Sequence, residues 1–593
     1  MTFNINLAMK PSNTFTNTII KKVTNKITMQ KNAAQVILAK PLQLAAIFPL
    51  LCLSLFASEV AAIQTGEGEI AASKAVAKQP NIVFIMSDDH AANAISSYQG
   101  RLSSVFKTPN IDRLATNGVR FNGMYANNSI CTPSRAAILT GQYSHTNGVK
   151  TLADSFDRKK DNVAKQLQLA GYQTAIVGKW HLKTQPSGFN YYNVLPNQGE
   201  YFAAKFKESG HKWQNGRKGG VVHPGYVTDV ITDVSLNWLN KRQQDKPFML
   251  MIHHKAPHGL WQPAKRHENF LANVKIPEPD SLYNRGKHGP TDAVIIDGKA
   301  GQQFGSSVSR RMEGRGLVTR MLDKDWPTGP LELDSYDWNT VVSAAYQKYL
   351  KDYLRTIKAV DENVGRVLDY LDANGLTENT IVIYTSDQGM MLGEHDYYDK
   401  RWIYEESIQM PFLVQYPKKM LPKRSYSEKT TGKSSAGRVS NELFLNIDIA
   451  PTLLDLAGVN KPVAMQGQSF KAALAQPETT NGRDAIYYRY WLHMAHHTIP
   501  AHYGIRTKTH KLAFFYGLPL DANGAMPAAT PPYWELYDLV NDPKEMNNLY
   551  PNKASSAIKA QLKQALSQLK KEIGDTDEQY PSLMAVKALH WNQ

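Results

Sequence analysis

Cysteine is almost absent from this chain, which has only two in 593 residues. One of them, Cys52, lies in an apolar stretch that a signal peptidase is expected to remove. The other, Cys131, would then have no partner, so an internal disulfide is excluded. A lone cysteine usually packs as a small, inert apolar side chain. A chemical role for Cys131 must therefore be argued from the residues around it.

Long apolar runs are also scarce, and the clearest lies near the N-terminus. Leu42–Phe56 is an apolar run of about 15 residues, which is short for a membrane span and is interrupted by Pro49. Lysines precede it and small residues follow it at 60–62, as in a secretory signal. We predict a signal peptide over residues 1–62, with Met29 as an alternative start, and a linker over 63–80. The mature protein is then expected to be secreted or periplasmic in a bacterium, with no membrane span.

Acidic residues are fewer than basic ones: the chain has 52 Asp and Glu but 68 Lys and Arg, which gives a formal net charge of +16. Residues 1–62 hold six lysines and one glutamate, so the mature chain keeps about +11. A basic surface attracts polyanions, most often nucleic acid. However, the sequence contains no helix-turn-helix, zinc-finger or RNA-binding signature. Together with export, this charge favours a sulfated polysaccharide partner and argues against nucleic acid.

Buried-strand patterns alternate with helical patterns through most of the chain. Apolar, β-branched runs predict strands at 81–86, 172–178, 246–253 and 380–385, and helical spacing predicts helices at 162–170 and 338–373. This alternation indicates an α/β fold with a large mixed, mostly parallel sheet flanked by helices. Residues 279–330 and 418–438 have the composition of loop insertions.

The pattern changes near residue 483. Short runs at 485–491, 503–506, 511–516 and 534–538 are typical of antiparallel strands, and a last helix is expected over 554–573. We therefore predict a main domain over 81–482 and a smaller C-terminal α+β subdomain with an antiparallel sheet over 483–593.

Acidic side chains follow two of the predicted strands. Asp88 and Asp89 come after the first strand, and Asp387 and Gln388 come after the strand at 380–385. The carboxyl ends of parallel strands meet at one edge of a sheet, so these groups should lie together. A single aspartate at a strand end usually serves a turn. Three carboxylates together would repel one another, and a hard divalent cation with oxygen ligands would relieve this repulsion.

Lysines and histidines follow other strands. Lys179 and His181 end one strand and His258 follows another, whereas Lys400 lies in a charged segment further on. A P-loop is excluded because no glycine-rich turn precedes Lys179. Histidines could indicate a zinc site, but the neighbouring carboxylates Asp88, Asp89 and Asp387 prefer a hard ion, which disfavours zinc. Each of these side chains could simply face solvent, although histidine has a pKa suited to a general acid.

The run from Cys131-Thr-Pro-Ser-Arg135 to Leu139-Thr-Gly141 resembles the signature of the type I sulfatases, in the alkaline phosphatase-like superfamily. Further resemblances, in the expected order, cover roughly residues 80–550 and lie at Asp88–Asp89, Gly178–Leu182, His253–His258 and Gly393–Ser407. The resemblance implies that a maturing enzyme oxidises Cys131 to Cα-formylglycine. It also implies a Ca²⁺ ion held by residue 131 and by Asp88, Asp89, Asp387 and Gln388. Many sulfatases have asparagine at the position of Gln388, which nevertheless offers an amide oxygen.

The resemblance further implies catalytic roles. The hydrated aldehyde attacks sulfur and is stabilised by Arg135, while Lys179 binds sulfate and His181 acts as a base. His258, helped by Lys400, protonates the departing sugar oxygen. The implied activity is hydrolysis of sulfate esters on a sulfated polysaccharide or its oligosaccharides. Ulvan, carrageenan and glycosaminoglycan types all remain open, including N-acetylglucosamine-6-sulfate units.

Two alternatives to this activity remain open. One is a phosphonate or phosphate ester hydrolase of the same superfamily, which would share the acidic residues and the cysteine motif. The other is a non-catalytic polysaccharide-binding protein that has kept the fold.

A cluster of histidines and aromatic residues lies in the predicted C-terminal subdomain. Trp491 and Tyr503 could stack on a sugar ring, although such clusters more often form polar surface. The weaker candidates for substrate binding are Trp491, His493, His496, His497, His502 and Arg506.

Overall fold

The computed structural model describes residues 79–283, 304–309, 316–417, 437–478 and 482–592. The predicted signal peptide, almost all of the linker and large parts of both expected loop insertions lie outside these residues. All described elements belong to one unit, residues 76–593. No helix in this part of the chain has the length and apolar character needed to cross a bilayer.

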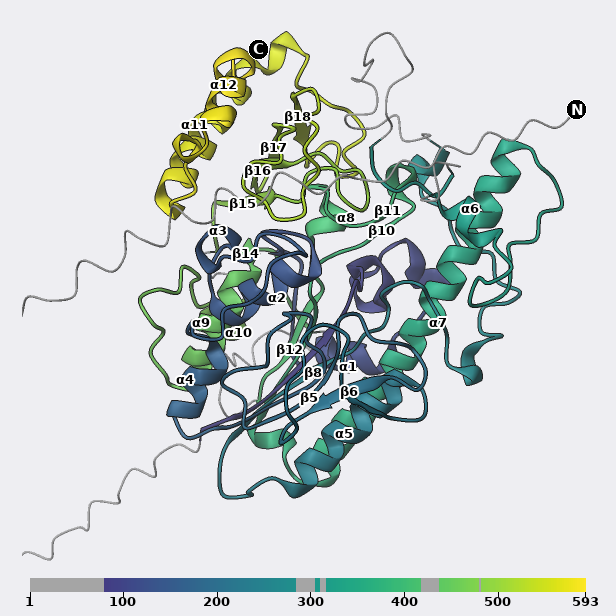
Figure 1. Cartoon of the computed structure of the whole chain (residues 1–593), viewed down its shortest axis with the longest axis vertical. Helices are drawn as coiled ribbons and strands as arrows, with labels where there is room; N and C mark the ends of the chain where they lie inside the picture. The colour runs from purple at the N-terminus through teal and green to yellow at the C-terminus, as the bar shows by residue number, and fades with distance from the viewer. Residues whose placement is uncertain (1–78, 284–303, 310–315, 418–436, 479–481, 593) are drawn as a thin grey trace, which may run out of the picture. The chain divides into compact units, whose positions relative to one another are not determined.

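A ten-stranded mixed sheet lies at the centre of the fold, in the order β13-β2-β12-β9-β1-β8-β4-β5-β6-β7 (Figure 1). Its strands are β1 Asn81–Ser87, β2 Val119–Phe121, β4 Gln173–Lys179, β5 Tyr191–Leu195, β6 Lys205–Glu208, β7 Val221–Val222, β8 Phe248–His253, β9 Thr380–Ser386, β12 Phe412–Gln415 and β13 Arg438–Ser440. β1 pairs in parallel with β8 and β9, and β8 pairs in parallel with β4. The carboxyl ends of these four strands therefore share one edge. This confirms the predicted fold class.

Helices cover both faces of the sheet, as Figure 1 shows. They are α1 Pro109–Thr116, α2 Cys131–Thr140, α4 Val163–Leu169, α5 Val227–Lys241, α7 Trp338–Ala373 and α9 Ile449–Leu456. Ile82 and Phe84 of β1 pack with α2, α4 and α9, whereas Val83 and Ile85 pack with α1, α5 and α7. Since both faces are covered, every side chain of β1 is buried. Each such apolar side chain contributes about 1.5–3 kcal/mol to folding.

A separate antiparallel sheet, in the order β15-β16-β17-β18, confirms the expectation for the C-terminal part of the chain. It consists of β15 Ala485–Tyr490, β16 His502–Thr507, β17 His510–Phe515 and β18 Tyr533–Asp538, followed by α11 Ser556–Ile573 and α12 Pro581–His590. The sheet shares one hydrophobic cluster with Tyr125, Ile130, Trp402 and Ile403 of the preceding chain. The C-terminal sheet therefore packs against segments of the preceding chain, including Ala137 of α2.

Buried polar groups also join the C-terminal sheet to the rest of the fold. Lys511 lies 2.9 Å from Glu405, in α8 (Glu405–Ile408), and 2.6 Å from Glu545. Glu535 of β18 is fully buried, and its carboxyl oxygens lie 3.2 and 3.1 Å from the Tyr404 hydroxyl. Burial raises the pKa of Glu535 to about 8. The folded protein therefore holds a proton on Glu535 at neutral pH.

This proton predicts a pH dependence of stability. The folded state keeps it up to about pH 8, whereas the unfolded chain releases it near the ordinary value of 4.5. Between these values the folded state binds more protons, so the contribution of Glu535 to stability falls as pH rises and levels off above about 8. Glu535→Gln keeps a neutral side chain, and its Tm should fall less than that of the wild type between about pH 5 and 8. A Tm difference between the two proteins that is constant across this range would contradict the assignment.

Candidate active site

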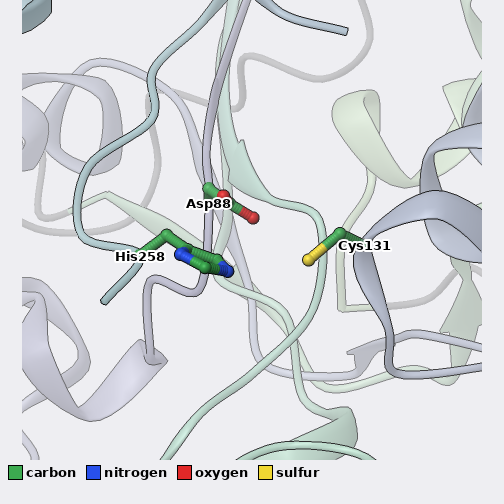
Figure 2. A group of neighbouring side chains, drawn as sticks. All are labelled: Asp88, Cys131 and His258. Carbon is green, nitrogen blue, oxygen red and sulfur yellow. The ribbon is translucent and has the colours of Figure 1, made fainter. Parts of the chain in front are cut away.

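Three predicted site residues converge at the carboxyl edge of the main sheet. Asp88 follows β1, Cys131 begins α2 and His258 lies in the loop after β8, and Figure 2 shows their side chains pointing toward one another. One ligand atom of each lies within 4.8 Å of the other two. The same holds for the set Asp88, Asp89 and Asp387. The sulfur atom therefore lies at the border of a buried acidic cluster.

Arg135 and Lys179 neutralise two of these carboxylates. Arg135 Nε donates to Asp387 Oδ2 at 2.9 Å, and its Nη2 lies 3.6 Å from Asp88 Oδ1. Lys179 Nζ donates to Asp88 Oδ2. Arg135 is four residues after Cys131 on α2, so both side chains lie on one face of the helix. A single helix thus brings the thiol and a cation to the same acidic cluster.

Lys400 and Gln388 both contact Asp89. Lys400 Nζ donates to Asp89 Oδ2, and Gln388 Nε2 donates to Asp89 Oδ1. Burial by itself would lower the pKa of Lys400, but the Asp89 carboxylate outweighs it and the pKa is raised. Lys400 is therefore firmly protonated. His258 Nε2 lies 3.8 Å from the same carboxylate oxygen that Lys400 contacts.

The acidic cluster has the character of a cation site. Asp88 Oδ1 and Gln388 Oε1 are buried and accept no hydrogen bond from any residue that the structure describes. Burial, and then the nearby Asp88 carboxylate, raise the pKa of Asp387 to about 7. Buried carboxylates that lie close together repel one another, and the pKa of one of them rises. Carboxylate and amide oxygens are the ligands that Ca²⁺ prefers. The residues predicted to hold a metal ion therefore fit one chemically.

Cys131 itself is poorly suited to act as a thiol. It is 2% exposed, and burial, followed by the negative charge of Asp88, raises its pKa to about 12. The thiolate, not the thiol, is the nucleophile, so an unmodified Cys131 would react slowly at neutral pH.

The two candidate histidines are both held neutral. Burial, followed by the positive charge of Lys179, keeps the pKa of His181 and of His258 well below the usual value. His258 Nδ1 lies 2.7 Å from the Gly259 carbonyl oxygen, so Nδ1 carries the proton and Nε2 faces the acidic cluster. The Thr132 hydroxyl donates to the His181 carbonyl at 3.1 Å, which fixes His181 beside α2.

Two polar residues outside the predicted set support these groups. Gln198 Oε1 accepts a hydrogen bond from Lys179 Nζ. Asn446 donates to the Ser134 hydroxyl at 2.8 Å, and that hydroxyl in turn donates to the Asp387 carbonyl. Each is a single polar residue in a connecting segment, and no local sequence signal distinguishes it from other such residues.

A third unpredicted residue, Tyr488 of β15, links two segments of the site. Its hydroxyl lies 2.8 Å from Ser129 Oγ and donates to the Arg401 carbonyl at 2.6 Å. Ser129 is two residues before Cys131, and Arg401 directly follows Lys400. The C-terminal sheet thus helps to hold both segments.

The six C-terminal candidates do not form one surface. Trp491, His493 and His502 are buried within the packing of the C-terminal sheet. The Arg489 guanidinium lies 3.5 Å from the centre of the Trp491 ring, and His502 stacks on Phe515 with ring centroids 4.4 Å apart. These side chains are therefore engaged in structural contacts.

The remaining candidates lie elsewhere. Arg506 pairs with Glu405 at 3.1 Å. His496 is exposed, whereas His497 Nε2 lies 3.6 Å from Asp399, the residue before Lys400. His497 is thus the candidate in contact with a segment of the active site, and sugar binding by any of the six stays a prediction.

Comparison with known proteins identifies the family. The sulfatase family model matches residues 80–459, and the model for the C-terminal region of N-sulphoglucosamine sulphohydrolase matches residues 393–572. The chain therefore belongs to the sulfatase family and is a sulfuric ester hydrolase. This confirms the resemblance drawn from the sequence motifs.

Relatives and solved structures extend this comparison. The N-acetylglucosamine-6-O-sulfatase of Bacteroides thetaiotaomicron is 39% identical over 526 residues, which cover 84% of this chain and 88% of the relative. A structure of a protein in complex with its substrate D-glucosamine-2-N,6-O-disulfate is similar with a TM-score of 0.72 and 36% identity, covering 84% of this chain and 99% of that one. A phosphonate monoester hydrolase from Silicibacter pomeroyi has a TM-score of 0.60 and 18% identity, covering 83% and 96%. The last likeness shows the fold alone.

The contacts of Tyr488 predict the effect of removing its hydroxyl. Tyr488→Phe leaves the Ser129 hydroxyl and the Arg401 carbonyl short of one partner, which should cost about 1–3 kcal/mol in the free energy of unfolding. Turnover of an aryl sulfate should also fall, because the segments that carry Cys131 and Lys400 loosen.

Tyr533→Phe is the matched control, since the Tyr533 hydroxyl has no hydrogen-bond partner among the described residues. Urea unfolding and initial rates compare the two variants. Equal stability and turnover in both would show that Tyr488 does not hold the site together.

Proposed function

We propose that this protein is exported and removes 6-O-sulfate groups from glucosamine or N-acetylglucosamine units of a sulfated polysaccharide or its oligosaccharides. Two observations support this substrate: the 39% identical N-acetylglucosamine-6-O-sulfatase and the similar structure with bound D-glucosamine-2-N,6-O-disulfate. The observation in this chain that carries the proposal is the convergence of Cys131, Asp88 and His258 beside two further carboxylates.

Ca²⁺ is the metal in this proposal. Asp88, Asp89, Asp387 and Gln388 would hold it through their oxygen atoms, two of which are buried and lack a hydrogen-bond donor. The bound ion would supply positive charge that stabilises the charge developing on the ester.

Residue 131 is the nucleophile in this proposal, after a maturing enzyme has oxidised it. Formylglycine would supply a carbonyl whose hydrate offers a hydroxyl in place of a thiol that keeps its proton up to about pH 12. Position 131 begins α2, and Arg135 on the same helix face holds the adjacent carboxylate in place.

The other side chains bind the sulfate and move protons. Lys179 and Lys400 are buried ammonium groups, which contact Asp88 and Asp89 respectively. Two positive charges suit the dispersed negative charge of a sulfate group. His258 Nε2 would donate a proton to the departing sugar oxygen. The pKa of His258 is low in the free site. A bound sulfate ester would raise this pKa, because its negative charge favours the protonated imidazole that a general acid requires. His181, which is buried and neutral, fits the role of base.

The alternatives have weaker support. A phosphonate or phosphate ester hydrolase would use the same anion-binding groups, but the likeness to such an enzyme is at 18% identity and concerns the fold. A protein that only binds polysaccharide would have no need of buried, paired charges such as Arg135 and Asp387, because burying them costs stability and such groups cluster at catalytic sites.

Replacing the proposed nucleophile tests the activity. Cys131→Ala should lower sulfate release from N-acetylglucosamine 6-sulfate by at least about 1,000-fold. Its Tm should stay near that of the wild type, because the substitution removes only one sulfur atom from the protein interior. Cys131→Ser should be similarly inactive, because serine lacks the second hydroxyl of the hydrate.

The substrate panel for this test contains glucosamine sulfated at other positions, an aryl sulfate and a phosphonate ester. Sulfate release by Cys131→Ala would contradict the role of residue 131. Faster hydrolysis of the phosphonate than of every sulfate would favour the alternative enzyme.

Removing the metal tests the second part of the proposal. A chelator should slow sulfate release and lower Tm, because the crowded carboxylates then repel one another, and added Ca²⁺ should restore both. A ligand at 100 times its Kd stabilises by about 2.7 kcal/mol. Asp387→Asn should abolish the response of Tm to Ca²⁺, with Asp369→Asn, on the exposed face of α7, as the control. A Tm that is the same with chelator and with Ca²⁺ would contradict a calcium site.

A further inference from the structure

A pocket of about 320 Å³ opens beside His181. Its walls come from the segments that follow β4, β5 and β6, and they include Trp180, Asn197 and Trp213. The volume falls at the small end of the range of about 300–1,000 Å³ for small-molecule sites.

The pocket adjoins the sulfate site and shares one residue with it, because His181, the proposed base, lines the pocket. Asp88, Cys131 and His258 do not line it, so a group that fills it lies beside the reacting ester. Its walls nevertheless join the site at two points. The His181 carbonyl accepts from Thr132 on α2, and Gln198, which follows the lining residue Asn197, accepts from Lys179. The pocket wall and the sulfate site are therefore direct neighbours.

Two indole rings line this pocket, but Trp180 is only 3% exposed, so the half-buried Trp213 is the ring with surface to offer a ligand. Trp213 Nε1 donates to Asn215 Oδ1 at 3.2 Å, and Lys207 Nζ lies 4.3 Å from the centre of the Trp213 ring. Trp180 packs edge-on against Phe189, with ring centroids 6.0 Å apart. A fixed aromatic ring such as that of Trp213 offers apolar surface at little conformational cost, which suits the flat apolar face of a pyranose ring.

The polar groups of the pocket are basic or neutral. Lys183 is exposed and donates one hydrogen bond, to the Ala153 carbonyl at 2.5 Å, so two donors of its ammonium group remain. No acidic side chain is found among the described residues that line the pocket. The adjoining loop adds three exposed cations: Lys212, Arg217 and Lys218. An anionic ligand is therefore favoured over a neutral one.

We propose that this pocket is a second sugar subsite, which binds the unit next to the one that carries the reacting ester and selects a neighbour with an anionic group. That group is a sulfate or a uronate carboxylate. The subsite rests on the proposed function for the identity of the first sugar, and its selectivity is measurable without turnover.

Calorimetry on the full-length Cys131→Ala protein tests the subsite. The probes are N-acetylglucosamine 6-sulfate alone and disaccharides in which it is joined to a uronic acid, a sulfated hexose or a neutral hexose. At least one anionic disaccharide should bind about tenfold more tightly than the monosaccharide and the neutral disaccharide. The tighter of the two anionic probes identifies the group that the pocket selects.

Two substitutions in this background locate the effect. Trp213→Ala should remove the gain from the second sugar, whereas Tyr336→Ala, at a tyrosine that is 79% exposed, should not. Lys183→Ala should reduce the preference for anionic over neutral disaccharides, with Lys553→Ala, another exposed lysine, as its control. Thermal unfolding of each variant confirms that it is folded.

The outcomes separate this proposal from the proposed function. Equal affinity for all four sugars, or an equal loss for mono- and disaccharide in Trp213→Ala, overturns the subsite. A neutral disaccharide that binds as tightly as the anionic ones overturns its charge selection. Anionic disaccharides that bind through Trp213 without sulfate release by the matured wild type would refute the proposed function and support the subsite.

Discussion

The neutralisation of three buried carboxylates by fixed positive charges is the interaction on which the rest of this structure depends. Asp88 and Asp387 end neighbouring parallel strands, so the sheet itself forces them together. Burying such charges without partners costs several kcal/mol for each ion. The partners come from three other parts of the fold: Arg135 from α2, Lys179 from the end of β4 and Lys400 from the charged loop that precedes α8. Because these elements must all be in place, the same interaction that allows the acidic cluster also positions residue 131.

The C-terminal sheet contributes to the site without lining the acidic cluster. Through Tyr488 it holds the segment before Cys131 and the segment after Lys400, and through Lys511 and Glu535 it is joined to α8 and Tyr404. A small antiparallel sheet placed far along the chain thus restrains two loops that would otherwise be free to move. This explains in physical terms why its buried face is so rich in aromatic and charged side chains. These aromatic and charged side chains hold the loops of the active site in place.

The main elements were predictable because their patterns are local. The helical spacing over residues 338–373 predicts α7 with its observed bounds, and the apolar β-branched run predicts β1 to within one residue. α2 was not predictable, because all ten of its residues are buried and no amphipathic periodicity remains. The histidines after Trp491 have the spacing of one helix face, but the chain forms no helix there and takes positive φ at Met494 and His496. The supporting residues Gln198 and Tyr488 act through contacts distant in sequence, which a single sequence does not reveal.

The account rests on the chemical state of residue 131, and a mass measurement reads that state directly. The tryptic peptide of residues 121–135 should be isolated from protein produced together with its maturing enzyme. Conversion of the Cys131 side chain to the aldehyde makes this peptide about 18 Da lighter than the thiol form. Because hydration of the aldehyde restores about 18 Da, the protein is first treated with a thiol-alkylating reagent, and the account predicts that the aldehyde peptide and its hydrate, both unalkylated, dominate in active protein. Active protein in which this peptide retains the full mass of an alkylatable thiol would contradict it.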